Sequence, residues 1–110
     1  MKPATERWIT ELARQKGLLV IGPNCMGVIN ADPAVSMNAT FAPTPASRGS
    51  IGFVSQSGAL GVAILNEAAD LGIGLTQFAS IGNKTDVTGN DLLEYWEDDD
   101  ETKVICMYLE

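Results

Sequence analysis

Residues 50–110 alternate between short apolar runs and helical patterns, and this alternation constrains the fold more than any other feature of the sequence. The predicted elements, in chain order, are a strand at 51–55, a helix at 58–71, a strand at 75–80, a helix at 90–98 and a strand at 103–109. Strands that alternate with helices through short connections pair in parallel and have right-handed crossovers. The sequence therefore predicts an α/β fold with a parallel sheet, in which we expect the thiol of Cys106 to be buried.

The N-terminal part predicts a separate piece of structure. Residues 4–16 carry apolar side chains at helical spacing, and the all-apolar run 18–21 predicts a short buried strand. Residues 30–49 contain three prolines among small and polar residues, so we expect an irregular linker there. The predicted organisation is the end of one domain at 1–29, a linker at 30–49 and the start of a second domain at 50–110. Such a half-sheet has exposed edges, which favours a fragment of a larger enzyme or one part of an oligomer.

The charge of the chain excludes some classes of partner. The sequence has 14 acidic and 7 basic residues and no histidine, which gives a formal net charge of −7. This excess of negative charge argues against a nucleic-acid partner, because nucleic-acid-binding surfaces are basic. No apolar run is long enough to cross a bilayer and no secretory signal is visible, so we expect a cytoplasmic protein with no membrane partner. The two cysteines lack the spacing of a zinc site, and we expect this chain to bind no metal.

The turn Ser55-Gln56-Ser57-Gly58-Ala59 stands between a predicted strand and a predicted helix. Ligands of α/β proteins bind beyond the carboxyl ends of parallel strands. The first turn of a helix offers free N–H groups and a positive dipole end to an anion. Ser57 suits either a helix cap or a donor to a phosphate oxygen. We therefore expect a phosphate site at these five residues, which also suit an ordinary capped turn.

A second glycine-rich turn, from Gly22 to Gly27, contains Asn24 and Cys25. The Asn24 amide offers both a hydrogen-bond donor and an acceptor. A nucleophilic cysteine needs a neighbouring base or cation, and the chain has no histidine to supply one. We therefore expect Cys25 to line a ligand site or to belong to a structural turn rather than to act as a nucleophile.

Two further polar sites follow predicted strands. The loop with Gly82, Asn83, Lys84 and Asp86 comes after the second strand of the alternating region, where Lys84 would steady a phosphate. A solvated turn explains the same residues equally well. Glu110 follows the last strand, where its carboxylate would orient a cationic or phosphorylated partner. The alternative is that Glu110 has no functional role.

Five segments of the chain, in this order and at this spacing, resemble the nucleoside-diphosphate-forming acyl-CoA synthetases, which are relatives of the succinyl-CoA synthetase α subunit. The segments are Gly22-Pro23-Asn24-Cys25-Met26-Gly27, Asn38-Ala39-Thr40-Phe41, Gly52-Phe53-Val54-Ser55-Gln56-Ser57-Gly58-Ala59-Leu60, Gly82-Asn83-Lys84-Thr85-Asp86-Val87 and Met107-Tyr108-Leu109-Glu110. Each segment alone is weak, but together they are specific and they cover essentially the whole chain.

The resemblance implies that 1–29 is the C-terminal end of a Rossmann-like CoA-binding domain and that 50–110 begins a flavodoxin-like domain. It implies that Asn24 and Cys25 lie near the thiol end of CoA, and that the 55–59 turn holds phosphate or a phosphohistidine. It also implies that Glu110 hydrogen-bonds a catalytic histidine. That histidine, the glycine turn of the CoA domain and an ATP-grasp domain, which binds ADP or ATP with Mg, lie outside these residues in the family.

The implied reaction interconverts acyl-CoA, ADP and phosphate with a carboxylate, CoA and ATP, through an acyl phosphate and a phosphohistidine. A helix dipole and oriented N–H groups would stabilise the transferred negative charge. We expect the 110 residues alone to be inactive, and to act in an oligomer with CoA, phosphate and an ATP-grasp domain or subunit. Two alternatives stay open: the synthetase-like sensor part of a protein lysine acetyltransferase, and a non-catalytic module that binds phosphate or CoA.

Overall fold

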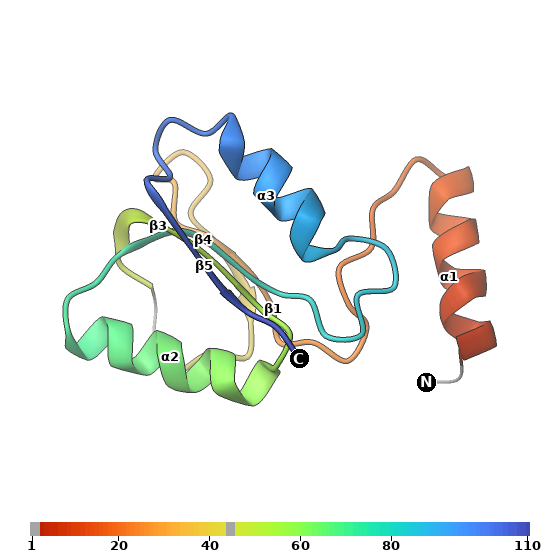
Figure 1. Cartoon of the computed structure of the whole chain (residues 1–110), viewed down its shortest axis with the longest axis horizontal. Helices are drawn as coiled ribbons and strands as arrows, with labels where there is room; N and C mark the ends of the chain where they lie inside the picture. The colour runs from red at the N-terminus through yellow and green to blue at the C-terminus, as the bar shows by residue number, and fades with distance from the viewer. Residues whose placement is uncertain (1–2, 44–45) are drawn as a thin grey trace.

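A mixed five-stranded sheet organises the chain in the computed structural model, which describes residues 3–43 and 46–110 (Figure 1). The elements are α1 (Pro3–Gln15), β1 (Gly27–Asn30), β2 (Met37–Thr40), β3 (Arg48–Ser55), α2 (Gly58–Asp70), β4 (Leu75–Ser80), α3 (Gly89–Glu97) and β5 (Val104–Tyr108). The strand order is β2-β1-β4-β3-β5. β3 pairs in parallel with β4 and β5, whereas β1 pairs antiparallel with β2 and β4.

The half of the molecule from β3 to β5 has the predicted alternation of strands and helices. β3 lies between β4 and β5, so the chain crosses first to one side of β3 and then to the other. Right-handed crossovers in opposite directions place their helices on opposite faces of a sheet. α2 and α3 accordingly cover opposite faces (Figure 1). The predicted α/β class is confirmed, and the predicted parallel pairing is confirmed for these three strands.

The N-terminal part differs from the sequence expectation. Residues 18–21 form no strand, and Leu19 is 82% exposed. The first strand is β1 instead, where Val28 faces Ala79 of β4 and Ile29 faces Phe78. An apolar run forms a buried strand only where a neighbouring strand and a covering layer exist. No described residue supplies a strand partner for 18–21.

The predicted linker at 30–49 is only partly irregular. It contains all of β2 and the first residues of β3, while residues 44–45, including Pro45, lie outside the described part. β2 pairs antiparallel with β1 along four residues, so the sheet is mixed rather than parallel throughout. Strands of four residues carry too little periodicity to stand out from the surrounding polar sequence.

Two apolar cores lie on the two faces of the sheet. The core on the α2 side contains Met26, Ile29, Phe53, Leu65, Leu75 and Phe78. The core on the α3 side contains Val54, Ala79, Ile81 and Trp96. Gly52 permits the second core, because a methyl group at this position would lie 2.7 Å from the Trp96 ring. Each large buried side chain stabilises the fold by roughly 1.5–3 kcal/mol, so these cores fix the three parallel strands and their helices.

The edge beyond β5 is less buried than the sequence predicts. Cys106 in β5 is exposed rather than buried, and Leu71, at the end of α2, is 65% exposed. Both line an apolar groove of about 420 Å³ between α2 and β5. β5 is an edge strand with β3 as its one partner in the described sheet, so its outer side is left open.

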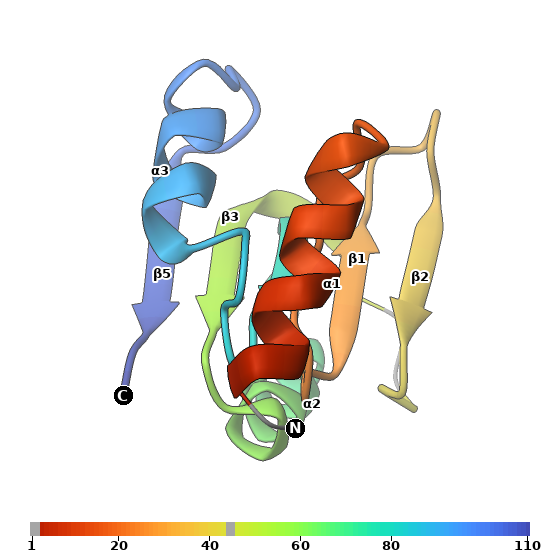
Figure 2. The same ribbon diagram turned by 90° about the vertical axis from the view of Figure 1, so that its right-hand side faces the viewer.

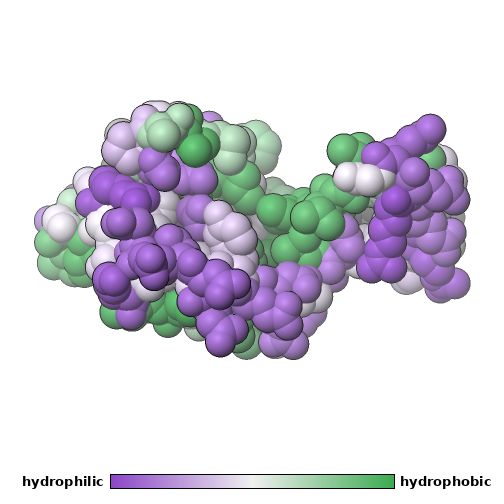
Figure 3. Space-filling view, turned by 90° about the horizontal axis from the view of Figure 1, so that it is seen from above, coloured by the Kyte–Doolittle hydropathy of each residue, from purple (hydrophilic) through white to green (hydrophobic). Residues whose placement is uncertain are grey.

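α1 stands apart from the sheet (Figure 1), and it faces the viewer in front of the strands in Figure 2. Thr10 and Ala13 are its buried residues, whereas Trp8 and Leu12 are exposed. Hydrophobic surface gathers where the chain passes between α1 and the remainder of the molecule (Figure 3). Neither α1 nor any other helix among residues 3–43 and 46–110 is long and apolar enough to cross a membrane.

Candidate functional site

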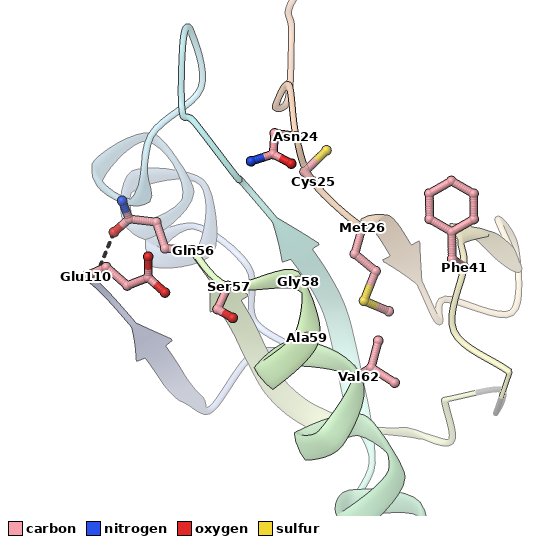
Figure 4. Close-up of a pocket in the computed structure, with 10 residues that line it drawn as sticks. All are labelled: Asn24, Cys25, Met26, Phe41, Gln56, Ser57, Gly58, Ala59, Val62 and Glu110. Carbon is pink, nitrogen blue, oxygen red and sulfur yellow. Dashed lines mark hydrogen bonds between the residues drawn. The ribbon is translucent and has the colours of Figure 1, made fainter. Parts of the chain in front are cut away.

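A cavity of about 490 Å³ opens at the carboxyl end of β3 (Figure 4). Its lining consists of Asn24, Cys25, Met26, Phe41, Gln56, Ser57, Gly58, Ala59, Val62 and Glu110. These residues come from the turn before β1, the end of β2, the β3–α2 connection, the start of α2 and the end of β5. Ligand sites of α/β proteins lie at this end of the parallel strands. The cavity brings together most of the residues that the sequence singled out.

The β3–α2 connection forms a rigid wall of the cavity. The fully buried Ser55 donates a hydrogen bond from its hydroxyl to the carbonyl oxygen of Ser57 at 2.6 Å. Ser57 is the N-cap of α2, and its Oγ accepts a hydrogen bond from the N–H of Leu60 at 3.2 Å. The N–H groups of Gly58 and Ala59 lie in the first helical turn, where no intrahelical partner exists. This wall therefore offers two backbone donors, one hydroxyl proton and the positive end of the α2 dipole.

Gln56 joins this wall to the end of β5. Its N–H donates to the carbonyl oxygen of Tyr108 at 2.9 Å, and its Oε1 accepts from the N–H of Glu110, also at 2.9 Å. The Glu110 side chain extends from the end of β5 toward Ser57 (Figure 4). Gln56 thus fixes the backbone from which the Glu110 carboxylate enters the cavity.

The turn that carries Asn24 and Cys25 forms the opposite wall. Its backbone leaves the usual regions, with φ values of 104° at Gly22, 54° at Asn24 and 116° at Gly27. The buried Ser80 at the end of β4 accepts a hydrogen bond from the N–H of Met26 at 3.0 Å. The half-buried Cys25 thiol donates weakly to the carbonyl oxygen of Ile21, at 3.7 Å. The geometry leaves Cys25 as a lining residue, and the described lining contains no lysine, arginine or histidine that would activate its thiol.

The loop with Gly82, Asn83, Lys84 and Asp86 lies behind this turn and does not line the cavity. The N–H of Asn83 donates to the carbonyl oxygen of Pro23 at 2.9 Å, and the N–H of Thr85 donates to that of Gly22 at 3.1 Å. A methyl group at Gly82 would overlap the carbonyl oxygens of Pro23 and Asn24. The loop therefore holds the Asn24 turn in place.

Asp86 connects the same loop to α1. Its Oδ1 accepts a hydrogen bond from Arg14 at 3.2 Å, and its Oδ2 accepts from the N–H of Val20 at 3.0 Å. The Val87 N–H in turn donates to the carbonyl oxygen of Val20 at 3.1 Å. The connection between α1 and the cavity wall is thus mainly polar.

Sequence reasoning assigned no function to the apolar side of the cavity, which Met26, Phe41 and Val62 form. Phe41 directly follows β2 and is 86% exposed, and its N–H donates to the carbonyl oxygen of Met26 at 3.4 Å. Phe41 belongs to one of the five segments that carried the family resemblance, so a signal for it was present. Its role could not be inferred because the β1–β2 hairpin that brings it to the cavity was not predicted.

The comparison with known families decides the affiliation of the chain. The family described as "Succinyl-CoA ligase like flavodoxin domain" matches residues 48–110. The chain belongs to this family. It is 44% identical over 105 residues to an acetate–CoA ligase (ADP-forming) of Methanocaldococcus jannaschii, a match that covers 96% of the chain and 15% of the relative. It is 42% identical over 105 residues to subunit alpha of acetate–CoA ligase (ADP-forming) II of Pyrococcus furiosus, with 96% and 22% covered.

Solved structures of this succinyl-CoA ligase-like group have the same fold. An acetyl-coenzyme A synthetase 1 of Ca. Korarchaeum cryptofilum, solved with phosphate and ADP, matches with a TM-score of 0.91 and 38% identity, covering 98% of this chain and 23% of that chain. The resemblance drawn from the five sequence segments is therefore confirmed. The chain spans less than a quarter of the length of each of these three proteins.

Proposed function

We propose that the chain contributes a ligand-binding cavity to an NDP-forming acyl-CoA synthetase, which interconverts acyl-CoA, ADP and phosphate with a carboxylate, CoA and ATP. The observation that carries the proposal is the cavity itself, in which the α2 N-terminus, the Asn24 turn and Glu110 meet. The names of the relatives, which are ADP-forming CoA ligases, support CoA and a nucleotide as ligands of the whole enzyme. The same names favour a ligase over the acetyltransferase sensor and over the non-catalytic module.

Phosphate is the ligand proposed for the α2 end of the cavity. The N–H groups of Gly58 and Ala59 and the hydroxyl of Ser57 would donate to its oxygens. No lysine or arginine is among the described lining residues, and the Glu110 carboxylate lies toward Ser57. Phosphate and Glu110 would repel each other unless a hydrogen-bond donor lay between them. A histidine from outside these residues, hydrogen-bonded to Glu110, would meet this requirement.

The thiol end of CoA is the ligand proposed for the Asn24 and Cys25 end. An acyl phosphate at α2 and a thiol at this turn would then share one cavity, and holding two reactants side by side is a large part of catalysis. The apolar side, with Met26 and Phe41, would contact the uncharged parts of these ligands. No metal is part of the proposal for this chain, and the described residues contain no group of three or more candidate metal-ligating side chains.

The proposal also covers domains and partners. Residues 1–29 would end a Rossmann-like CoA-binding domain, 30–49 would connect, and 50–110 would begin the flavodoxin-like domain, a start supported by the family match from residue 48. An ATP-grasp domain or subunit would bind ADP or ATP with Mg. A relative named "subunit alpha" supports a partner subunit and hence an oligomer. We propose a cytoplasmic location.

Titration of the ¹⁵N-labelled chain with inorganic phosphate, followed by NMR, tests the phosphate end. We expect saturable shifts of the Gly58 and Ala59 amide signals. The start of α3, which lies outside the cavity and carries Asp91 in its first turn, provides a second helix N-terminus for comparison. Equal shifts at both helix starts, or none at α2, would contradict the proposal. The chain alone should show no ATP turnover that depends on CoA and phosphate.

A further inference from the structure

The Asn24 amide is held in one orientation by side chains outside the cavity. We propose that Glu6 of α1 is a positioning residue that acts through Asn83 and turns the carbonyl oxygen of Asn24 toward the cavity. This end of the cavity then accepts a hydrogen bond from a neutral donor, such as the thiol or an amide N–H of a pantetheine arm. The inference rests on the proposed function and names the chemistry that the Asn24 end recognises.

The first step concerns the Glu6 carboxylate. Its Oε1 accepts a hydrogen bond from Nδ2 of Asn83 at 2.6 Å, and its Oε2 accepts from the hydroxyl of Thr85 at 3.2 Å. An ionised carboxylate accepts hydrogen bonds and cannot donate them. The nitrogen of the Asn83 amide must therefore face Glu6, so the oxygen of that amide must face the other way.

The second step passes this orientation to Asn24. Oδ1 of Asn83 accepts a hydrogen bond from Nδ2 of Asn24 at 3.3 Å. Because the nitrogen of Asn24 is used in this contact, its Oδ1 lies on the side of Cys25 (Figure 4). Among the described residues, none donates a hydrogen bond to this oxygen. An asparagine amide can exchange the positions of its nitrogen and oxygen by a half-turn. Here the Glu6 carboxylate, acting through Asn83, selects one of the two orientations of Asn24.

The third step is that one backbone hydrogen bond and one ion pair keep the side chains of Glu6, Asn83 and Asn24 within reach of one another. The Asn83 N–H is bonded to Pro23, next to Asn24, so the two amides lie on one framework. The ion pair between Arg14 and Asp86 holds the far end of α1 to the same loop. The ion pair thus holds α1, and with it Glu6, to the loop that carries Asn83, while the Pro23 contact holds Asn83 to Asn24; neither contact involves a ligand.

The consequence is a cavity whose two ends have opposite polarity. The start of α2 offers N–H donors, which suit the oxygens of phosphate. The carbonyl oxygen of Asn24 suits a thiol or amide donor and repels phosphate oxygens. The cavity thus favours an anion at the start of α2 together with a neutral hydrogen-bond donor at Asn24. It disfavours the reverse placement of the two ligands.

The substitution Glu6→Lys reverses the first contact and tests the inference. A lysine donates to Oδ1 of Asn83, which turns the nitrogen of Asn83 toward Asn24 and the nitrogen of Asn24 toward the cavity. We expect pantetheine, titrated into the chain and followed by NMR, to bind about five-fold more weakly, since one hydrogen bond is lost. Phosphate binding at Gly58 and Ala59 should not weaken. Glu11→Lys makes the same charge change on an exposed position of α1 and should leave pantetheine binding unchanged.

A double-mutant cycle separates positioning from a general loss of structure. In the Asn24→Ala background, Glu6→Lys should have no further effect on pantetheine. An equal effect in both backgrounds would overturn the inference. NOEs from the side-chain NH₂ of Asn83 should reach the Glu6 methylene protons in the wild-type chain and those of Asn24 in the Glu6→Lys chain. If neither pantetheine nor phosphate binds the wild-type chain, the proposed function fails, while the NOEs still decide the orientation of the amides.

Discussion

The two parts of this molecule are held in place by different forces. β3, β4 and β5 with their helices enclose two apolar cores, so burial of large side chains sets their positions. α1 and residues 22–25 of the Asn24 turn are attached through hydrogen bonds and one ion pair to the loop after β4, whereas Met26, near the end of that turn, is buried in the core on the α2 side. The cavity lies between these two parts, with its α2 wall on the first and its Asn24 wall on the second. One wall is therefore as stable as the fold, and the other can be loosened without unfolding the sheet.

The largest effect is expected from Phe78→Ala. Phe78 is almost fully buried in the core under α2, and its ring lies 5.3 Å, centre to centre, from that of Phe53. Removing such a ring costs roughly 3–5 kcal/mol of unfolding free energy. Urea unfolding followed by circular dichroism measures it. Phe41→Ala removes an exposed ring and should change the unfolding free energy by less than about 0.5 kcal/mol; similar losses for both would contradict the comparison.

Gly82→Ala should release the Asn24 wall while leaving the sheet intact. Gly82 has φ +53°, and a methyl group there overlaps the turn that carries Asn24. We expect faster hydrogen exchange at the amides of Asn83 and Thr85, with unchanged protection in β3 and β4. Gly72→Ala is a matched control, because Gly72 has φ +69° but nothing within 4 Å of the added methyl group. It should incur the conformational cost alone, about 1–2 kcal/mol, without faster exchange at the Asn24 turn.

Arg14→Ala should have a smaller effect, confined to the attachment of α1. The ion pair with Asp86 joins a side chain that is 69% exposed to one that is 8% exposed. Because the Arg14 side of the pair is in solvent and Asp86 keeps its hydrogen bond from the Val20 N–H, we expect a loss near the upper end of the range for exposed pairs, about 1 kcal/mol. We expect a fall in melting temperature of a few degrees at most, with faster exchange at the amide of Val20. Arg7→Ala, on the same helix but without an ion pair in the described chain, should change neither.

The smallest effect concerns acid stability at the end of α3. The Thr102 hydroxyl donates to Asp99 at 2.7 Å, and this hydrogen bond is the main cause that holds the pKa of Asp99 below its ordinary value. A lowered folded-state pKa stabilises the fold above the unfolded-state pKa, near 4, and this contribution is lost as the pH falls through the folded-state pKa. Asp99→Asn should therefore flatten the decline of the melting temperature below about pH 4. If Asp100→Asn flattened the decline equally, the cause would be the removal of a negative charge and not the hydrogen bond between Thr102 and Asp99.

The sequence predicted the part of the fold that burial determines. The alternation after residue 50 is strong because each of these strands and helices contributes an apolar face to a core, and β3, α2, β4, α3 and β5 appeared where expected. The prediction of a strand at 18–21 was wrong, because an apolar pattern indicates which side chains need burial but not whether a partner strand exists. The prediction that Cys106 is buried was wrong for the same reason, since the outer side of β5 is open.

Part of the site could be predicted because its residues follow apolar runs, although of the runs before Ser57, Asn24 and Glu110 only the first and the last form strands. Ser57, Asn24 and Glu110 all reached one cavity, as their positions after apolar runs indicated. Lys84 and Asp86 occupy an equivalent position in the sequence but lie behind the cavity, because the loop turns away at Gly82, where φ is +53°. The contact between Glu6 and Asn83 joins residues 77 positions apart and has no local pattern. Side-chain contacts across such separations depend on tertiary structure alone.

Gln56 connects the start of α2, where we propose that an anion binds, to the backbone that follows β5. One residue, at the start of the α2 connection, is bonded to both Tyr108 and Glu110. Where two binding events are coupled through a shared element, the coupling is reciprocal. An anion that ordered the start of α2 through Gln56 would therefore also favour the backbone position of Glu110 that Gln56 holds. Conversely, a partner that drew that backbone away from Gln56 would lower the affinity for such an anion, and the anion would be released without any change in the donors at the start of α2.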